Sequence, residues 1–219
     1  MVPPSVNRPG VVASLRDLVP LRPLTYGQAM RIAELQAARF LRLRDITEGP
    51  VPESAISELP RVQVDRIRFL PASGATQWAS QRWLVLLNGA EPRERQRFSL
   101  AHEFKHIIDH RFVDLMYSKF PDADRKRMIE QLCDYFAACL LMPRPWVKRA
   151  YCGGVQDIAR LASLFDVSQS AMQVRLTCIG LIDRTPRCID DWTSPILGSV
   201  NDVLYERSAN PRFATELAA

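Results

Sequence analysis

Apolar residues recur at three- and four-residue steps in five segments of the chain, and this spacing predicts a helix in each. The predicted helices span residues 25–44, 91–110, 123–141, 155–165 and 168–180. Between the first two helices, three short segments alternate apolar and polar positions and are predicted strands, at 62–70, 76–80 and 82–87. Helices arranged around a separate group of short strands predict an α+β fold with a small, mostly antiparallel sheet.

The same pattern divides the chain into four parts. Residues 1–24 contain five prolines and little periodicity, so they are predicted to form an extended N-terminal arm. Residues 25–150 form the main domain, and residues 151–182 form a helical pair that packs on it. Residues 183–219 are predicted to be a polar C-terminal tail.

Composition and charge narrow the class of protein further. The 219 residues are 47% hydrophobic and 24% charged, which is typical of a globular protein with enough core to fold without a structural metal. No apolar run reaches the roughly 18 residues of a membrane span, and the N-terminus lacks a secretory pattern. Five cysteines without paired spacing indicate reduced thiols in a cytoplasmic protein. The net charge of +5 is compatible with nucleic acid, although a solvated basic surface explains it more simply.

The strongest chemical signal is a motif on the second predicted helix. His102 and His106 are four residues apart, so they share one helix face and can direct imidazole nitrogens at a single ion. Glu103 follows the first histidine, where its carboxylate can reach a water molecule instead of the ion. Two histidines and a glutamate on a largely buried helix would be costly without a partner, which favours a metal site over a coincidence of sequence.

A catalytic zinc needs a third protein ligand, and the next helix offers it. Glu130 is the predicted ligand, and Asp134, one turn later, is predicted to accept a hydrogen bond from a ligating histidine. Cys133 competes for the ligand position, but a buried core thiol is the simpler interpretation. His110 lies four residues after His106, but the helical period of 3.6 residues turns it away from the ion. It is therefore predicted to contact the ligating residues from outside or to lie in the core.

Two runs of sequence, residues 97–110 and 130–143, resemble the ImmA/IrrE family of zinc metallopeptidases. The resemblance covers about residues 25–182 and implies a zincin-like fold, in which a small sheet packs on the helix that carries His-Glu-x-x-His and on a second, ligand-bearing helix. It implies zinc bound by His102, His106 and Glu130, with Glu103 as the catalytic carboxylate. Lys105 and Cys133 depart from the glycine and alanine usual in the family, and Asp134 from a frequent asparagine; none of these changes removes a ligand.

The resemblance also implies a function: a zinc-dependent endopeptidase that cleaves an XRE-type helix-turn-helix repressor and so relieves repression, in a phage, a mobile element or a stress response. We expect the substrate to lie along residues 82–87 as an added strand, contacting Arg82, Trp83, Leu84 and Val85. The group that stabilises the oxyanion is left open among Tyr135, Tyr117 and the arginines. The alternative is a non-enzymatic regulator of the same fold that binds DNA or a partner protein.

The helical pair near the end has the rhythm of a helix-turn-helix. Ser168 is placed to cap a second helix that would present Gln169, Gln173 and Arg175 outward. Few basic residues lie there, so phosphate contacts are poorly supported. Packing beside the catalytic cleft explains the pattern better than DNA binding does.

Overall fold

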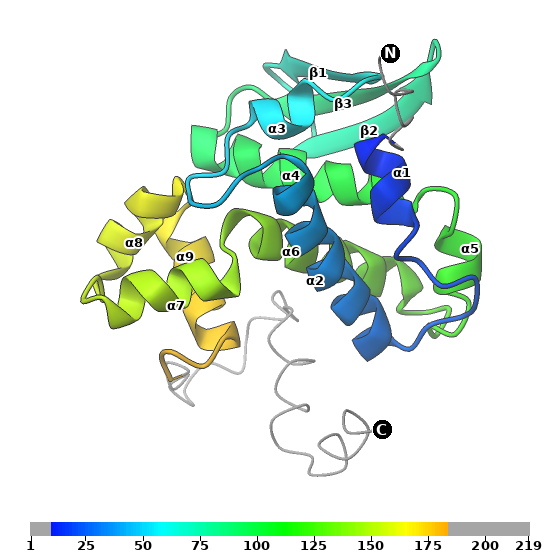
Figure 1. Ribbon diagram of the computed structural model, residues 1–219. Helices are drawn as coiled ribbons and strands as arrows, with labels where there is room; N and C mark the ends of the chain where they lie inside the picture. The colour runs from blue at the N-terminus through cyan, green and yellow to red at the C-terminus, as the bar shows by residue number, and fades with distance from the viewer. Residues whose placement is uncertain (1–9, 184–219) are drawn as a thin grey trace, which may run out of the picture.

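Helix α4 (Arg93–Asp109) lies between a small sheet and two long helices. In the computed structural model, which describes residues 10–183, three strands and nine helices form a mixed α and β architecture (Figure 1). The sheet contacts one side of α4, while α6 (Arg125–Leu141) and α2 (Tyr26–Leu43) lie on the other side. The helix that carries the histidines is therefore packed from both sides.

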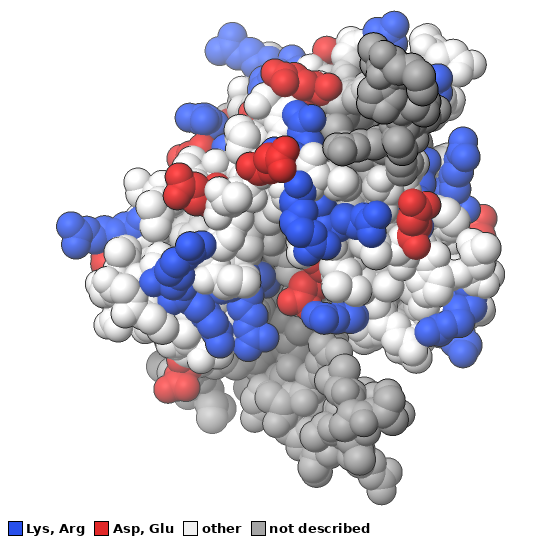
Figure 2. Space-filling model, viewed as in Figure 1, with Lys and Arg blue, Asp and Glu red and all other residues white. Residues whose placement is uncertain are grey.

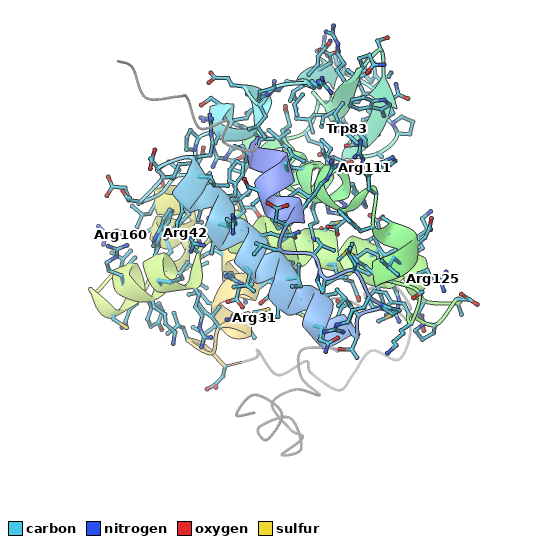
Figure 3. All side chains as sticks on the ribbon, turned by 45° about the vertical axis from the view of Figure 1, so that its right-hand side comes forward. Arg31, Arg42, Trp83, Arg111, Arg125 and Arg160 are labelled. Carbon is cyan, nitrogen blue, oxygen red and sulfur yellow. The ribbon has the colours of Figure 1, made fainter. Side chains whose placement is uncertain are left out.

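Helix α2 forms for reasons that are local to its sequence. The Thr25 hydroxyl accepts a hydrogen bond from the Gln28 backbone N–H, and the Gln28 side chain accepts one from the Thr25 backbone N–H, which completes a capping box. Its buried residues recur at helical spacing, whereas Arg31 and Arg42 extend into solvent from the other face (Figure 3). The buried face of α2 packs on α6.

An aromatic cluster joins the three long helices. The ring centroids of Phe40 in α2 and Phe104 in α4 are 5.2 Å apart, and those of Phe104 and Phe136 in α6 are 6.2 Å apart. All three rings are fully buried. Edge-to-face and tilted contacts of this kind add to the hydrophobic gain, so the cluster fixes α4 and α6 relative to each other.

The sheet has the order β1-β3-β2, with bounds Val62–Ile67 for β1, Gly74–Ala79 for β2 and Arg82–Asn88 for β3. β3 is parallel to β1 and antiparallel to β2, so the prediction of a mostly antiparallel sheet is corrected to a mixed one. Val85 and Leu87 are fully buried on one face of β3, as the period of two requires. β3 is the central strand, and β2 forms an edge.

Short helices complete the described part of the chain: α1 (Val11–Arg16), α3 (Ser54–Ser57), α5 (Val113–Met116), α7 (Arg144–Cys152), α8 (Ile158–Phe165) and α9 (Gln169–Cys178). The prediction of an extended arm is wrong for α1. Leu15 is fully buried, and the Arg16 guanidinium donates hydrogen bonds to the backbone carbonyls of Ile107 and Ile108 at 2.7 and 3.0 Å. Residues 1–9 and all but the first residue of the predicted tail, 183–219, lie outside the described part.

A polar cluster is buried on the side of α4 that faces α2. The Lys105 ammonium, on a fully buried side chain, pairs with the Asp109 carboxylate at 2.7 Å and donates to the Gln36 side chain at 2.8 Å. The Tyr117 hydroxyl donates a short hydrogen bond to Asp109, and burial raises the pKa of that hydroxyl well above its usual value. Each charge in this cluster is paired, which is the condition for tolerating it in a protein interior.

Two general features follow from the described residues. None of their helices is both long and apolar enough to cross a membrane. Cys133, Cys139 and Cys152 are free thiols; Cys188 lies outside the described part.

Replacing Lys105 with Met should destabilise the fold by about 3–5 kcal/mol, because the buried Asp109 carboxylate would lose its cationic partner. The measurement is urea unfolding followed by circular dichroism. Arg31→Ala is the control, since the exposed pair of Arg31 with Glu34 should contribute no more than about 1 kcal/mol. Equal losses in the two variants would contradict a structural role for the buried pair.

Candidate metal centre

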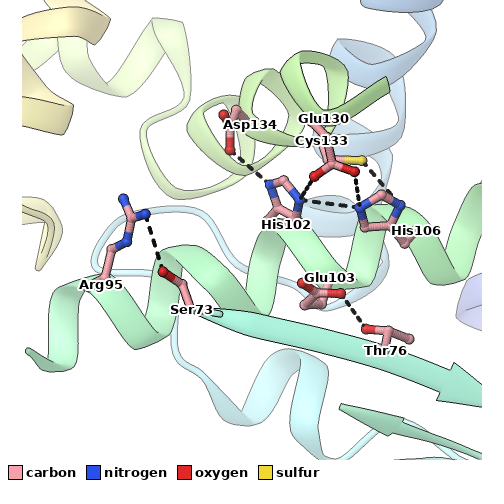
Figure 4. A network of polar contacts seen from close by, with 9 residues as sticks. All are labelled: Ser73, Thr76, Arg95, His102, Glu103, His106, Glu130, Cys133 and Asp134. Atoms are coloured by element: carbon pink, nitrogen blue, oxygen red, sulfur yellow. Dashed lines mark hydrogen bonds and ion pairs between the residues drawn. The ribbon is translucent and has the colours of Figure 1, made fainter. Parts of the chain in front are cut away.

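The two histidines of α4 point into the space between α4 and α6 (Figure 4). The Nε2 atoms of His102 and His106 are 3.2 Å apart, as expected for residues one helical turn apart with converging rings. Neither ring is fully buried, and His102 lines a cleft between α4, α6 and α9. α4 therefore presents two nitrogen donors to one point at the floor of a cleft.

Glu130 of α6 supplies the third donor. Its Oε2 lies 3.2 Å from Nε2 of His102, and its Oε1 lies 3.7 Å from Nε2 of His106. Ligands about 2.0–2.2 Å from a tetrahedral ion are separated by roughly 3.4 Å. The three pairs of donor atoms have nearly this separation, so the residues fit a tetrahedral metal ion with one position left for another ligand.

The electrostatics of the site keep Glu130 ionised. Hydrogen bonds with His102 and His106 hold the pKa of the Glu130 carboxyl far below its usual value. Burial alone would lower the pKa of His102, but its hydrogen bonds with Asp134 and Glu130 outweigh burial and raise this pKa to about 9. Glu130 is thus held as a carboxylate, which is the form that binds a cation.

Cys133 is the alternative third ligand. One ligand atom from each of His102, His106 and Cys133 can be chosen so that all three lie within 4.8 Å of one another. However, the Cys133 sulfur contacts Nδ1 of His106, at 3.7 Å, whereas Nε2 of the same ring faces His102 and Glu130. The geometry favours Glu130, and burial raises the pKa of the Cys133 thiol well above its usual value.

Glu103 points to the other side of α4, toward the edge strand β2 (Figure 4). The Thr76 hydroxyl donates a hydrogen bond to Oε2 of Glu103 at 2.7 Å. Gly74 allows the close approach of the strand, since a Cβ there would lie 2.9 Å from Oε1 of Glu103. The carboxylate is therefore oriented by β2. Sequence reasoning missed Thr76 and Gly74, because no local signal shows which strand lies beside α4.

A cleft of about 650 Å³ connects these groups. His102, Glu103 and Glu130 line it at one end, and Tyr135 lines it farther along α6. The start of β2 and one face of α9 form two of its walls. Tyr117, in contrast, is buried against Asp109, which leaves Tyr135 as the tyrosine able to meet a molecule in the cleft.

Two sets of predicted site residues lie elsewhere. His110 is exposed at the end of α4, and its ring packs edge-on against Trp83 with centroids 4.9 Å apart, so the structure does not bring it to the ligands. Residues 82–85 belong to β3, whose backbone is paired on both sides. The prediction that a substrate adds to this strand is wrong, because a central strand has no free edge.

Side-chain contacts join the helical pair α8–α9 to α4 and to the end of α6. Arg97 of α4 contacts Asp166, in the turn between α8 and α9, through an ion pair of 3.1 Å and a bond to its backbone carbonyl. Arg175 of α9 donates to the Met142 carbonyl at the end of α6, at 2.9 Å. Arg175 is buried, so the prediction that it faces outward is wrong; Gln169 and Gln173 are exposed as predicted.

Comparison with known proteins agrees with this geometry. Residues 61–177, just over half of the chain, match the peptidase family described as the IrrE N-terminal-like domain. The chain belongs to this family. The resemblance to ImmA/IrrE proteins is thereby confirmed, and membership supports metallopeptidase activity.

Individual relatives match parts of this IrrE-like chain. The radiation response metalloprotease IrrE of Deinococcus radiodurans is 33% identical over 157 residues, which are 64% of this chain and 46% of the relative. The IrrE protein of Deinococcus deserti is 36% identical over 63 residues, 27% of this chain and 22% of the relative. The chain thus spans less than half the length of either curated relative.

One solved structure shares the fold. A Mycobacterium tuberculosis transcriptional regulator superposes with a TM-score of 0.56 at 18% identity, over 82% of this chain and 54% of the regulator. At this identity the likeness concerns the fold alone.

Replacing His102 or Glu130 with alanine should reduce bound zinc from about one ion per chain to near zero, because a catalytic site has only three protein ligands. The measurement is elemental analysis after dialysis against zinc-containing buffer. His110→Ala serves as the control and should retain the metal, since its ring packs on Trp83. Full zinc retention in the Glu130 variant would contradict the ligand set.

Proposed function

We propose that this chain is a zinc-dependent endopeptidase of zincin-like fold that cleaves an XRE-type helix-turn-helix repressor and thereby relieves repression. The observation that carries the enzymatic part is the convergence of two Nε2 atoms and one carboxylate at tetrahedral spacing. The ligands belong to two helices that the buried aromatic cluster holds together. When bound, zinc would lower the pKa of water to about 7 and polarise the scissile carbonyl.

Glu103 is the proposed general base and acid. Its Oε2 accepts a hydrogen bond from Thr76, so Oε1 is the atom left to take a proton from the attacking water. The same carboxyl group then returns the proton to the leaving amine. Because Glu103 is fixed by β2 and lines the cleft with His102 and Glu130, it can act without moving away from the reaction centre.

The edge strand β2 is the proposed docking site for the substrate backbone. β2 pairs with β3 on one side only, so its other edge can add an extended peptide through main-chain hydrogen bonds. The first residues of β2, near Gly74, line the cleft beside Glu103. This assignment replaces β3, and it places the scissile bond between the strand and the ligands.

The proposed class of substrate rests on the ImmA/IrrE resemblance and not on the shape of the cleft. The matched relatives carry the names of radiation response metalloproteases, and the structural neighbour is a transcriptional regulator. The names of the relatives support a metalloprotease that acts in a stress response, and cleavage of a repressor inside the cell is the mechanism implied by the ImmA/IrrE resemblance. On the face shown in Figure 2, basic and acidic side chains are interspersed, which gives DNA binding little support.

The variant Glu103→Gln should bind zinc as the wild type does and should cleave about 10²- to 10⁴-fold more slowly, because glutamine cannot take up the proton. The assay digests helix-turn-helix proteins encoded near the gene and identifies products by mass spectrometry, with zinc content measured in parallel. Cleavage at the wild-type rate would show that another group is the base. Full zinc loading with no cleavage by the wild type would favour the non-enzymatic alternative.

Thr76→Val should slow cleavage about 10- to 100-fold, because a hydrogen bond to a charged group contributes about 1.5–3 kcal/mol. Valine keeps the shape of threonine but cannot orient Glu103. Thr76→Ser retains the hydroxyl and should stay near the wild-type rate. Steady-state cleavage rates with the same repressor distinguish the two variants. Equal rates would show that the Thr76 hydroxyl does not orient Glu103.

A further inference from the structure

Helix α6 contacts each of the two histidine rings at Nδ1 as well as at Nε2. Glu130, Cys133 and Asp134 occupy positions i, i+3 and i+4, which lie on one helix face. Asp134 Oδ1 lies 2.8 Å from Nδ1 of His102, and the Cys133 sulfur lies 3.7 Å from Nδ1 of His106 (Figure 4). Each imidazole therefore has its own partner on α6, a carboxylate for one ring and a thiol for the other.

We propose that Cys133 is a positioning residue for His106: its sulfur accepts the Nδ1–H of the ring and keeps Nε2 directed at the metal position. A neutral imidazole carries one N–H, so a ring that binds metal through Nε2 must carry its proton on Nδ1. Partners of that outer N–H fix the tautomer and the ring orientation, and their loss typically costs 10–100-fold in metal affinity. This inference rests on the proposed metal centre.

The contact with His106 distinguishes Cys133 from a residue that only fills space. Its side chain is 1% exposed, so solvent does not take the place of the sulfur beside the ring. Truncation to alanine would leave a gap about the size of one sulfur atom. The Nδ1–H of His106 would then lose its acceptor.

Cys139 provides a matched comparison on the same helix. It is also buried, but its neighbours are Tyr135 and Arg175 instead of a histidine. Cys139→Ala and Cys133→Ala remove the same atoms from similar surroundings. A difference in metal affinity between them reports the contact with His106 and not a general loosening of α6.

The experiment measures zinc affinity of the full chain by competition with a chromophoric chelator, with thermal unfolding as a check on folding. Cys133→Ala should bind zinc 10–100-fold more weakly than the wild type, and Cys139→Ala should be unchanged. Cys133→Ser, whose hydroxyl oxygen is still an acceptor, should recover part of the loss. It also provides the comparison if the alanine variant does not fold.

A second readout does not depend on bound metal. Nitrogen-15 NMR of the histidine rings in the metal-free chain should show a shifted Nδ1 signal of His106 in Cys133→Ala and an unchanged one in Cys139→Ala, because only the first variant removes the partner of that nitrogen. Wild-type zinc binding with equal affinities for the two alanine variants would overturn the role of Cys133 alone. Failure of the wild type to bind zinc would overturn the proposed function and this inference together.

Discussion

The packing of α4 against α6 sets the position of every donor atom in the candidate metal centre. His102 and His106 are rigidly spaced by their own helix, but Glu130 reaches them only if α6 lies at the right distance and rotation. The contact of Phe104 with Phe136 fixes that relation from inside the core. A core substitution that shifted α6 by even an ångström would separate the carboxylate from the imidazoles without touching either.

Helix α4 has a buried, paired polar cluster on one side and cleft-lining polar residues on the other. On the side toward α2, Lys105 and Asp109 are buried and mutually neutralised, so they contribute no net charge. Where α4 borders the cleft, His102 and Glu103 line the space that a ligand can enter. The amphipathic pattern usual for a helix is therefore replaced by a helix that is polar on both sides, and this explains why its apolar residues are spread around it in the sequence.

How far the sequence predicts this structure depends on the range of the interactions. The long helices and the spacing of the histidines follow from local periodicity, and Glu130 follows from the ligand count of zinc. The order of the strands does not follow from local sequence, because pairing between distant segments leaves no local trace. The expectation that a substrate adds to β3 is wrong for this reason.

The burial of a single polar side chain likewise depends on distant partners and cannot be predicted from local sequence. An arginine is usually exposed, but Arg175 is buried because the carbonyl at the end of α6 accepts its hydrogen bond. Arg97 of α4 contacts Asp166, between α8 and α9, so the helical pair is joined to α4 as well as to the end of α6. Insertion of α9 into a DNA groove as a separate module would require breaking both contacts. The pair is better understood as a wall of the cleft, and under the proposed function the shape between α9 and β2 would determine which peptides fit.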